Sequence, residues 1–284
     1  MATQEIWTTI RILAWTKEFL AGKGVENSRL EAEWMLCAVT GLDRMGLYLN
    51  FERALDEAEL LSFRTMVSRR AKREPLQYIL GSQEFCGLEF EVTPDVLIPR
   101  HDTETLVNEA VARKPGTSHL LDIGTGSGCI AIAMAKRLPG ATVTAIELSE
   151  AALAVARRNA AINGAKVEFL AGSLLEPVAG RRFDLILSNP PYIPADDIAQ
   201  LEPEVRDYEP LGALVGGQDG MDLYRTMIPQ APSFLNSGGM LLVEIGISQS
   251  LEVVRLFQES GFEEIFTARD PGGIERVVGG EFNG

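Results

Sequence analysis

The sequence predicts an α/β protein with a doubly wound, Rossmann-like sheet, preceded by a small helical domain and a connecting β-hairpin. Two observations lead to this fold class. From about residue 104, apolar runs typical of buried strands alternate with helical stretches, as in a mostly parallel sheet covered by helices. The first 75 residues show only helical periodicity. We therefore expect a helical domain over residues 1–75, a hairpin connector over 76–99 and the α/β domain over 100–284.

The expected helical domain contains amphipathic segments. Ile10 and Leu13 belong to an apolar stripe at helical spacing, and we expect this stripe to face the core. Ser28 and Glu31 have the spacing of a capping box, in which two side chains satisfy backbone amides at a helix start. A further helix is expected over residues 56–72. We interpret the basic residues at its end as a solvated helix terminus, in preference to a contact with an acidic partner: Arg69, Arg70, Lys72 and Arg73.

A different pattern marks the connector. Phe85, Leu88 and Phe90 alternate with polar neighbours, and Gly87 lies where a tight turn would join two strands. A short hairpin is therefore expected between the helical and α/β parts.

The α/β part repeats strand and helix patterns along its length. Strands are expected at residues 119–123, 142–146, 166–170, 183–187 and 240–245, with two closing strands at 263–268 and 275–278. The most distinct helices are expected at residues 130–138, 150–162 and 251–261. In such a sheet, ligands bind beyond the carboxyl ends of the strands, so the residues that follow each strand are candidate site residues.

The composition limits the classes of function. Twenty-six basic residues against 40 acidic ones give a net charge of -14, which disfavours stable nucleic-acid binding because a nucleic-acid footprint needs a basic face. Two histidines and three scattered cysteines show no metal-ligand spacing, so no metal site is expected. There is no signal-peptide pattern and no apolar run of membrane-spanning length, so we expect a cytoplasmic protein without membrane contact.

A glycine-rich turn follows the first expected strand of the α/β part. It consists of five residues that open a helix: Gly124, Thr125, Gly126, Ser127 and Gly128. Glycines here would let the backbone approach a ligand closely. Glu147 ends the next strand, where an acid accepts hydrogen bonds from ribose hydroxyls. Asp122 would repel a pyrophosphate but suits the cationic groups of S-adenosylmethionine, so a methyl donor is favoured over a dinucleotide.

The tetrapeptide Asn189-Pro190-Pro191-Tyr192 directly follows another expected strand. Its prolines make the loop rigid and remove two backbone donors, so the Asn189 side-chain oxygen and the Pro190 carbonyl remain as acceptors. Two acceptors that bind the hydrogens of a planar NH₂ group would hold its weakly nucleophilic nitrogen and favour positive charge on it. Tyr192 would stack on the planar group. The motif predicts methyl transfer to an amide or exocyclic amine, with Asn189, Pro190 and Tyr192 as catalytic residues.

With these motifs in place, the sequence resembles the release factor glutamine methyltransferases. This family modifies the glutamine of the Gly-Gly-Gln motif in peptide chain release factors. The resemblance extends over essentially the whole chain, including the helical domain and the hairpin. Beyond the two motifs above, it is carried by four segments: Glu74–Gly81, Val96–Arg100, Glu209–Leu214 and Glu275–Val278.

The resemblance implies a fold, a reaction and a set of roles. The fold would be the Rossmann-like sheet of S-adenosylmethionine-dependent methyltransferases. Gly124–Gly128 would line S-adenosyl-L-methionine, which leaves as S-adenosyl-L-homocysteine, and Glu147 would hold its ribose. Asn189 would contact the donor and, with Pro190, Pro191 and Tyr192, receive the glutamine amide. Arg100 would be a further substrate-binding residue, and the N-terminal helices would help to hold the release factor.

The chain departs from the family pattern at two places. The family often has Pro-Glu-Thr-Glu after the arginine, whereas this chain has His101-Asp102-Thr103-Glu104. Near the adenine the family commonly has an acid and an aromatic residue, and this chain has Ser173 and Leu174. We expect Ser173 to hydrogen-bond the adenine amine and Leu174 to pack on the ring. The chain also contains the tripeptide Gly216-Gly217-Gln218, interpreted as a surface turn in preference to a self-methylation site.

Three alternatives remain open. A DNA adenine methyltransferase would use the same tetrapeptide on a base amine, although the acidic balance and the lack of a basic recognition domain disfavour it. Methylation of a ribosomal-protein glutamine is not distinguished by the sequence. A non-catalytic binding module with this fold is the third, and its behaviour would not change on substitution of Asn189 by alanine.

Overall fold

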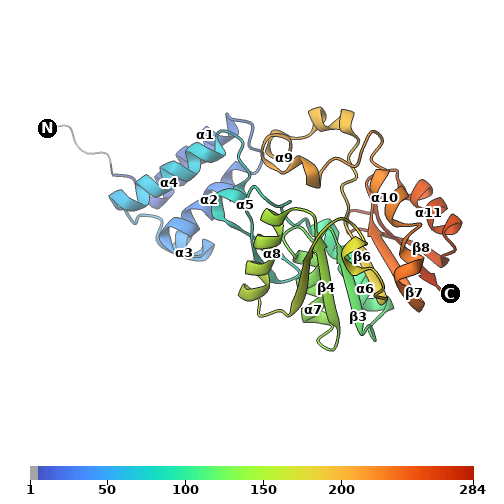
Figure 1. Ribbon diagram of the computed structural model, residues 1–284. Coiled ribbons are helices and arrows are strands. Elements are labelled where there is room, and N and C mark those ends of the chain that lie inside the picture. Colours follow the sequence, from blue (N-terminus) through green and yellow to red (C-terminus); the bar gives the residue numbers. More distant parts are fainter. Residues whose placement is uncertain (1–5) are drawn as a thin grey trace. The chain divides into compact units, whose positions relative to one another are not determined.

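The computed structural model describes residues 6–284. The described chain divides into two compact units. The N-terminal unit consists of the described residues up to Gly81 together with Glu202–Tyr208, and the sheet unit consists of Ser82–Leu201 and Glu209–Gly284 (Figure 1). A short segment from the middle of the chain thus belongs to the N-terminal unit.

Helices build the N-terminal unit. Their bounds are α1 (Thr9–Ala21), α2 (Ser28–Thr40), α3 (Arg44–Leu49), α4 (Glu57–Arg70), α5 (Leu76–Leu80) and α9 (Pro203–Tyr208). Leu20, Met35 and Phe63 are at most 2% exposed and belong to its apolar core. Burial of such side chains is worth about 1.5–3 kcal/mol each, so the core stabilises helices that would be marginal alone.

Two local predictions for this unit are wrong. Ile10 is 55% exposed, because the buried face of α1 contains two threonines, Thr9 and Thr16, which the apolar pattern did not reveal. Ser28 does not cap α2 either, since it is the first helical residue and Glu31 bonds Arg70 instead. The capping box occurs at α4, where the Asp56 side chain accepts from the Glu59 amide and the Glu59 side chain accepts from the Asp56 amide.

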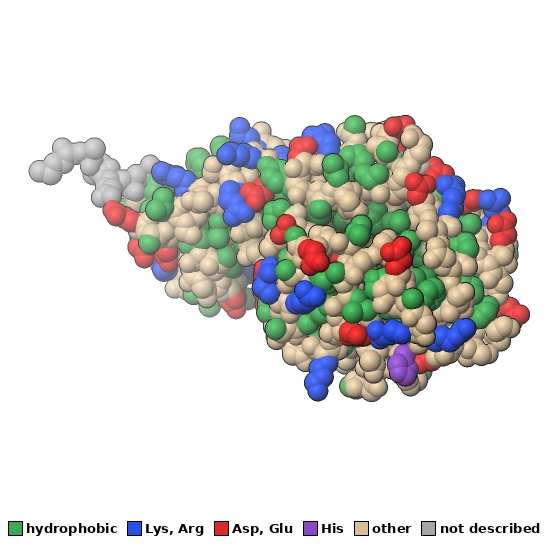
Figure 2. Space-filling view, in the orientation of Figure 1, with side chains coloured by type: hydrophobic (Ala, Val, Ile, Leu, Met, Phe, Trp, Pro, Cys, Tyr) green, Lys and Arg blue, Asp and Glu red, His purple; other side chains and the backbone are tan. Residues whose placement is uncertain are grey.

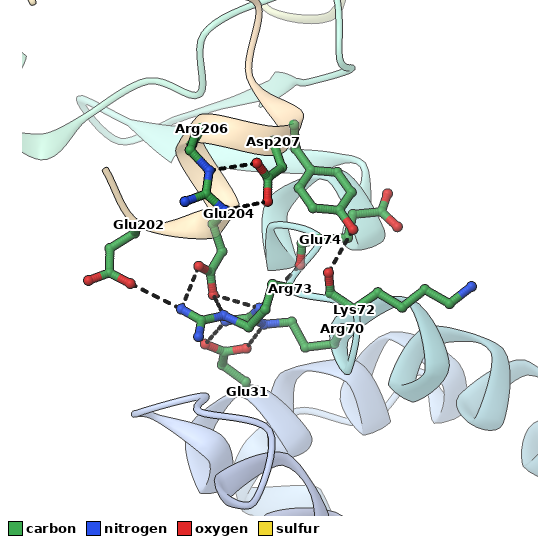
Figure 3. Close-up of polar contacts among 10 residues, drawn as sticks. Glu31, Arg70, Lys72, Arg73, Glu74, Glu202, Glu204, Arg206 and Asp207 are labelled. Atoms are coloured by element: carbon green, nitrogen blue, oxygen red, sulfur yellow. Dashed lines mark hydrogen bonds and ion pairs between the residues drawn. The ribbon is translucent and has the colours of Figure 1, made fainter. Parts of the chain in front are cut away.

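The prediction of a solvated end of α4 is wrong for Arg70 and Arg73, whereas Lys72 is exposed (Figure 3). Arg70 is only 5% exposed, and its guanidinium bonds Glu31 and, at 2.9 Å, Glu204. Arg73 donates two hydrogen bonds of 2.6 Å to Glu204 and one of 3.1 Å to Glu202. The arginines therefore fasten the segment Glu202–Tyr208 within the N-terminal unit.

One mixed sheet organises the sheet unit, as the fold-class prediction requires. Within residues 6–284 it has seven strands in the order β5-β4-β3-β6-β7-β9-β8. Their bounds are β3 (His119–Ile123), β4 (Thr142–Glu147), β5 (Val167–Ala171), β6 (Phe183–Ser188), β7 (Leu235–Glu244), β8 (Glu263–Arg269) and β9 (Glu275–Phe282). Strand β9 runs antiparallel to β7 and β8, and the other neighbours are parallel.

Helices cover the two faces of this sheet (Figure 1). The α-helices are α6 (Glu104–Arg113), α7 (Cys129–Arg137), α8 (Glu150–Ile162), α10 (Asp222–Met227) and α11 (Ser250–Glu259), and the 3-10 helices are η1 (His101–Thr103), η2 (Glu176–Val178), η3 (Ala195–Gln200), η4 (Leu211–Ala213) and η5 (Ala231–Phe234). Leu121 packs in a cluster with α10 and α11, whereas its neighbour Leu120 packs with α6 and α7. Successive strand residues thus point to opposite faces, and each face is buried.

The predicted hairpin is present. Strands β1 (Ser82–Phe85) and β2 (Leu88–Glu91) pair antiparallel through a two-residue turn. Cys86 and Gly87 both have positive φ, at 53° and 74°, as a primed hairpin turn requires. Phe85 and Phe90 are fully buried and join the cluster of α6 and α7, so the hairpin is part of the sheet unit's core.

Candidate functional site

Parallel strands bring the candidate residues to one edge of the sheet. Ile123 at the end of β3 pairs with Ile146 of β4 and with Ser188 of β6. Ser188 in turn pairs with Val243 of β7. The residue after each of these four positions therefore lies at the carboxyl edge of the sheet. These residues are Gly124, Glu147, Asn189 and Glu244. In doubly wound sheets, ligands bind at this edge.

A cavity of about 470 Å³ opens at this edge, within the sheet unit. Of the residues predicted for the site, it is lined by Arg100, Gly124, Thr125, Gly126, Ser127, Glu147, Ser173, Leu174, Asn189, Pro190 and Pro191. Its lining does not include Asp122, Gly128 and Tyr192. The structure thus brings the glycine turn and the tetrapeptide to one cavity, and gives three predicted residues other positions.

The glycines of the turn differ in what surrounds them. Gly124 and Gly126 have φ of 72° and 55°, and a Cβ added to either would meet no atom within 4 Å. Gly128 is different, because an added Cβ would lie 3.0 Å from Ile132 Cδ1 and 3.2 Å from Ala156 Cβ. Gly124 and Gly126 therefore leave room for a ligand, whereas Gly128 allows the first turn of α7 to pack closely on α8.

Glu147 is held beside the glycine turn. Its Oε2 accepts from the Gly126 amide at 2.8 Å and its Oε1 accepts from the Ser149 amide at 2.9 Å. Each carboxylate oxygen has a second lone pair, so both can still accept a hydroxyl proton. The carboxylate is thereby oriented before any ligand binds, as expected for a residue that holds a ribose.

Asp122 lies beneath the turn and does not face the cavity directly. Its carboxyl is fully buried, Thr125 donates to Oδ2 at 2.6 Å, and Oδ1 has no partner among the described residues. Burial raises its pKa to about 7, although the bond from Thr125 opposes this rise. At the cavity itself, an oriented Glu147 and two open glycines fit a nucleoside ligand, and the carboxyl of Asp122 lies buried nearby with one oxygen unpartnered among the described residues.

The side-chain amide of Asn189 is held by a hydrogen bond at its nitrogen. Its Nδ2 donates to the Thr103 hydroxyl at 3.2 Å, and Thr103, in η1, is only 2% exposed. Because Nδ2 is engaged, the Oδ1 atom of Asn189 remains as an acceptor at the cavity. Arg100 is also anchored, since its Nη2 donates to Oε1 of the buried Glu209 at 2.6 Å.

Tyr192 is directed into the protein. Its hydroxyl donates to Glu244 Oε1 at 3.4 Å, and burial raises the pKa of the phenol well above its usual value. A half-buried tyrosine gains from a partner for its hydroxyl, and Glu244 supplies one. Tyr192 is not among the residues that line the cavity, and its stacking on a substrate stays a prediction.

Residues that the sequence analysis missed support the tetrapeptide. The Gln249 Nε2 donates to the Tyr192 carbonyl at 3.0 Å, and its Oε1 accepts from the Gly246 amide at 2.8 Å. Gly216 lies so close to the loop that an added Cβ would be 2.5 Å from the Pro191 carbonyl oxygen. The tripeptide that begins at Gly216 therefore serves packing, and its exposed Gln218 side chain bonds Asp196.

Other classes of site receive no support in the described part of the chain. Among residues 6–284, no group of three His, Cys, Asp or Glu side chains is placed to hold a metal ion. No described helix combines the length and apolar character needed to cross a membrane. On the face shown in Figure 2, Lys and Arg side chains are scattered among Asp and Glu rather than gathered in one patch.

Comparisons with known proteins show which families this chain is similar to. The PrmC N-terminal domain family matches residues 11–81, and the methyltransferase small domain family matches residues 101–201. The chain is 59% identical to a release factor glutamine methyltransferase from Geobacter sulfurreducens over 97% of both chains. It is 44% identical to one from Gloeobacter violaceus, over 93% of this chain and 94% of that protein.

A solved structure shares the fold. It is a 16S rRNA N2 methyltransferase from T. thermophilus in complex with AdoMet and guanosine, with a TM-score of 0.53 and 21% identity. The match covers 71% of this chain and 49% of that chain.

Proposed function

We propose a function on the premise that the chain belongs to the release factor glutamine methyltransferase family. The chain would methylate the glutamine of the Gly-Gly-Gln motif in peptide chain release factors. The methyl group would pass from S-adenosyl-L-methionine to the side-chain amide nitrogen of that glutamine. The chain is an enzyme of the methyltransferase class. The observation that carries the proposal is the orientation of Asn189. Its amide lies in the same cavity as the open glycines, with Nδ2 held by Thr103 and Oδ1 left to accept.

The donor would occupy the part of the cavity beside the glycine turn. Gly124 and Gly126 would admit it closely, and Glu147 would accept hydrogen bonds from its ribose. Ser173 and Leu174 also line the cavity, and we expect them to contact the adenine. When bound, S-adenosyl-L-methionine supplies an electrophilic methyl group.

The chain's own residues would prepare the substrate nitrogen. A glutamine amide nitrogen is a weak nucleophile, because its lone pair is delocalised over the carbonyl. The Asn189 Oδ1 and the Pro190 carbonyl would accept its two hydrogens, which fixes the nitrogen and favours positive charge on it. Arg100, anchored by Glu209, would contact the substrate at the same cavity. We propose that the N-terminal unit helps to hold the release factor, and that the protein acts in the cytoplasm.

The competing substrates have less support. A base amine in DNA would need a basic surface, and the net charge of -14 and the scattered cations of Figure 2 disfavour it. A ribosomal-protein glutamine would suit the same two acceptors, but the relatives with high coverage are named for release factors.

The test is a direct comparison of substrates. The protein would be incubated with labelled donor and, separately, a release factor, ribosomal proteins or duplex DNA. We expect label on the release factor, located by mass spectrometry on the glutamine of the Gly-Gly-Gln motif.

Two controls sharpen this result. A release factor with alanine in place of that glutamine should take no label, and the enzyme variant Gln218→Ala should behave like the wild type. Label on DNA or on a ribosomal protein alone would contradict the proposal.

A further inference from the structure

One glutamine side chain bonds both the tetrapeptide and a loop that packs against it. Gln249 is half-buried and directly precedes α11. Its Nε2 donates to the Tyr192 carbonyl at 3.0 Å and to the Gly220 carbonyl at 3.3 Å. Its Oε1 accepts from the Gly246 amide, just after β7, at 2.8 Å. All of these residues belong to the sheet unit, so the side chain connects three segments of that unit.

The tetrapeptide has few amides of its own through which it could be held. Pro190 and Pro191 have no N–H group, so only their carbonyls can take part in main-chain hydrogen bonds. The Pro190 carbonyl is one of the two acceptors in the proposed function. Because peptide groups are planar, its direction depends on where the next residues lie. The Tyr192 carbonyl, two residues further on, is the group that Gln249 bonds.

Gly216 and Gly220 pack closely against the same part of the tetrapeptide. A Cβ added to Gly216 would lie 2.5 Å from the Pro191 carbonyl oxygen and 2.8 Å from Tyr192 Cα. A Cβ added to Gly220 would overlap the Tyr192 carbonyl. The Gly216 amide also donates to the Ile193 carbonyl at 2.9 Å. Only glycine fits such close backbone contacts, so a shift of this loop would move the tetrapeptide with it.

We propose that Gln249 is a positioning residue, which holds the tetrapeptide against Gly216 and Gly220 and thereby orients the Pro190 carbonyl toward the substrate amide. Its Nε2 bonds one carbonyl on each side of this contact, that of Tyr192 and that of Gly220. A side-chain amide suits this role because it donates two hydrogens and accepts at the same time. The inference rests on the proposed function, in which the Pro190 carbonyl receives one hydrogen of the glutamine amide.

The test compares Gln249→Glu and Gln249→Met with the wild type on a release factor at pH 8. Glutamate has the size of glutamine and can still accept from the Gly246 amide, but its carboxylate has no proton for the Tyr192 carbonyl. Methionine has a similar length and makes neither bond. We expect kcat to fall roughly tenfold or more in both variants, since a displacement of about 1 Å can cost about 100-fold in rate. The KM for the release factor should change less than about threefold.

The two variants separate positioning from a merely structural role. If Gln249 only supported Gly246, the glutamate variant would keep that bond and retain kcat, and the methionine variant alone would lose it. The matched controls are Gln258→Glu and Gln258→Met, because Gln258 is exposed on α11; both should keep the wild-type kcat. Calorimetry should show wild-type affinity for S-adenosyl-L-methionine in both Gln249 variants, which also verifies that they fold.

A glycine substitution tests the same contact from its other side. Gly216→Ala places a methyl group against the Pro191 carbonyl, and Gly216 lacks a positive φ, so the effect is steric. This variant should also lose kcat roughly tenfold with donor affinity unchanged. Gly140→Ala is the control, because Gly140 is exposed and a Cβ added there meets no atom within 4 Å.

Three outcomes overturn the inference. One is a wild-type kcat in Gln249→Glu, and another is a wild-type kcat in Gly216→Ala. The third is loss of donor binding in both Gln249 variants, because the residue would then be needed for folding rather than for position. Absence of turnover by the wild type on a release factor would be a different result, because it contradicts the proposed function itself.

Discussion

The two units each bury a polar cluster, and the clusters differ in how completely their members are satisfied. In the N-terminal unit, Arg70 bonds Glu31 and Glu204, and Arg73 bonds Glu204 as well (Figure 3). In the sheet unit, Glu244 has an oxygen without a partner and a raised pKa. A complete hydrogen-bond network holds its residues in one arrangement. An incomplete network beside a cavity can still bind a substrate group or a proton. Changes in the first cluster should therefore alter stability, and changes around the cavity should alter turnover.

The largest effect on turnover is expected at Asn189. Asn189→Ala removes the acceptor that would hold the substrate amide, so kcat should fall by about 10²–10³-fold. Affinity for the donor, measured by calorimetry, should stay close to that of the wild type. The exposed Asn283 provides a matched control, since Asn283→Ala should leave both quantities unchanged. Wild-type kcat in the Asn189 variant would favour a non-catalytic role for the motif.

The next effect is expected at Glu147 and concerns the donor. Glu147→Ala removes a carboxylate oriented by the Gly126 and Ser149 amides. Hydrogen bonds to charged groups contribute about 1.5–3 kcal/mol, so the dissociation constant should rise roughly 10- to 100-fold. Calorimetry measures this directly. Glu168→Ala, on the neighbouring strand β5, is the control, and equal affinities in the two variants would remove Glu147 from the donor site.

A third prediction tests the complete cluster. Glu204→Gln removes the charge shared by Arg70 and Arg73 and should destabilise the protein by about 1–3 kcal/mol in denaturant unfolding. Donor affinity should not change. The exposed pair Arg255–Glu252 offers the matched substitution Glu252→Gln, expected to cost less than about 0.5 kcal/mol. An equal cost in both variants would mean that the cluster is no more stabilising than a surface pair.

The smallest predicted effect is a pair of opposite pH slopes. The pKa of Glu204 is lowered in the folded state by Arg73 and Arg70 despite burial, so its stabilisation is present above about pH 4.5 and is lost in acid. The pKa of Glu244 is raised to about 7, so its contribution is lost as the pH rises from about 4.5 to 7. Thermal unfolding from acid to about pH 8 should show the stability of Glu204→Gln converging with that of the wild type below about pH 4.5. Toward pH 8, the Glu244→Gln variant should gain thermal stability relative to the wild type. Parallel curves of unfolding temperature against pH for all three proteins would contradict both pKa assignments.

The sequence predicted the features that are encoded locally. The glycine turn, Glu147 and the tetrapeptide each follow a strand directly, so the strand pattern alone placed them at one edge. Thr103, which lies in the segment His101–Glu104, and Glu244, which belongs to no motif, were missed because their partners are distant in sequence. One sequence signal could have identified Glu244 as a site residue. It ends a strand of the same parallel set as the strand that ends at Glu147 and the strand directly before Asn189.

Two of the wrong predictions, the cap of α2 and the solvated end of α4, share a physical cause. Ser28 and Glu31 have the spacing of a cap, but the long-range bond from Arg70 takes the Glu31 carboxylate away from it. The basic end of α4 was assigned to solvent for the same reason, since its acidic partner Glu204 lies 134 residues along the chain. Local rules cannot anticipate an ion pair between segments so far apart.

The segment Glu202–Tyr208 has a consequence for how such a protein can be inherited and recombined. The described chain crosses between its units after Gly81, after Leu201 and after Tyr208. A single genetic crossover near residue 81 would therefore combine the helices of one parent with the Glu204 segment of another. Such a hybrid would keep its arginines paired only if both parents carried the matching acid. Exchange of the N-terminal unit between proteins thus requires that two separated parts of the gene, those for the N-terminal helices and for Glu202–Tyr208, are inherited together.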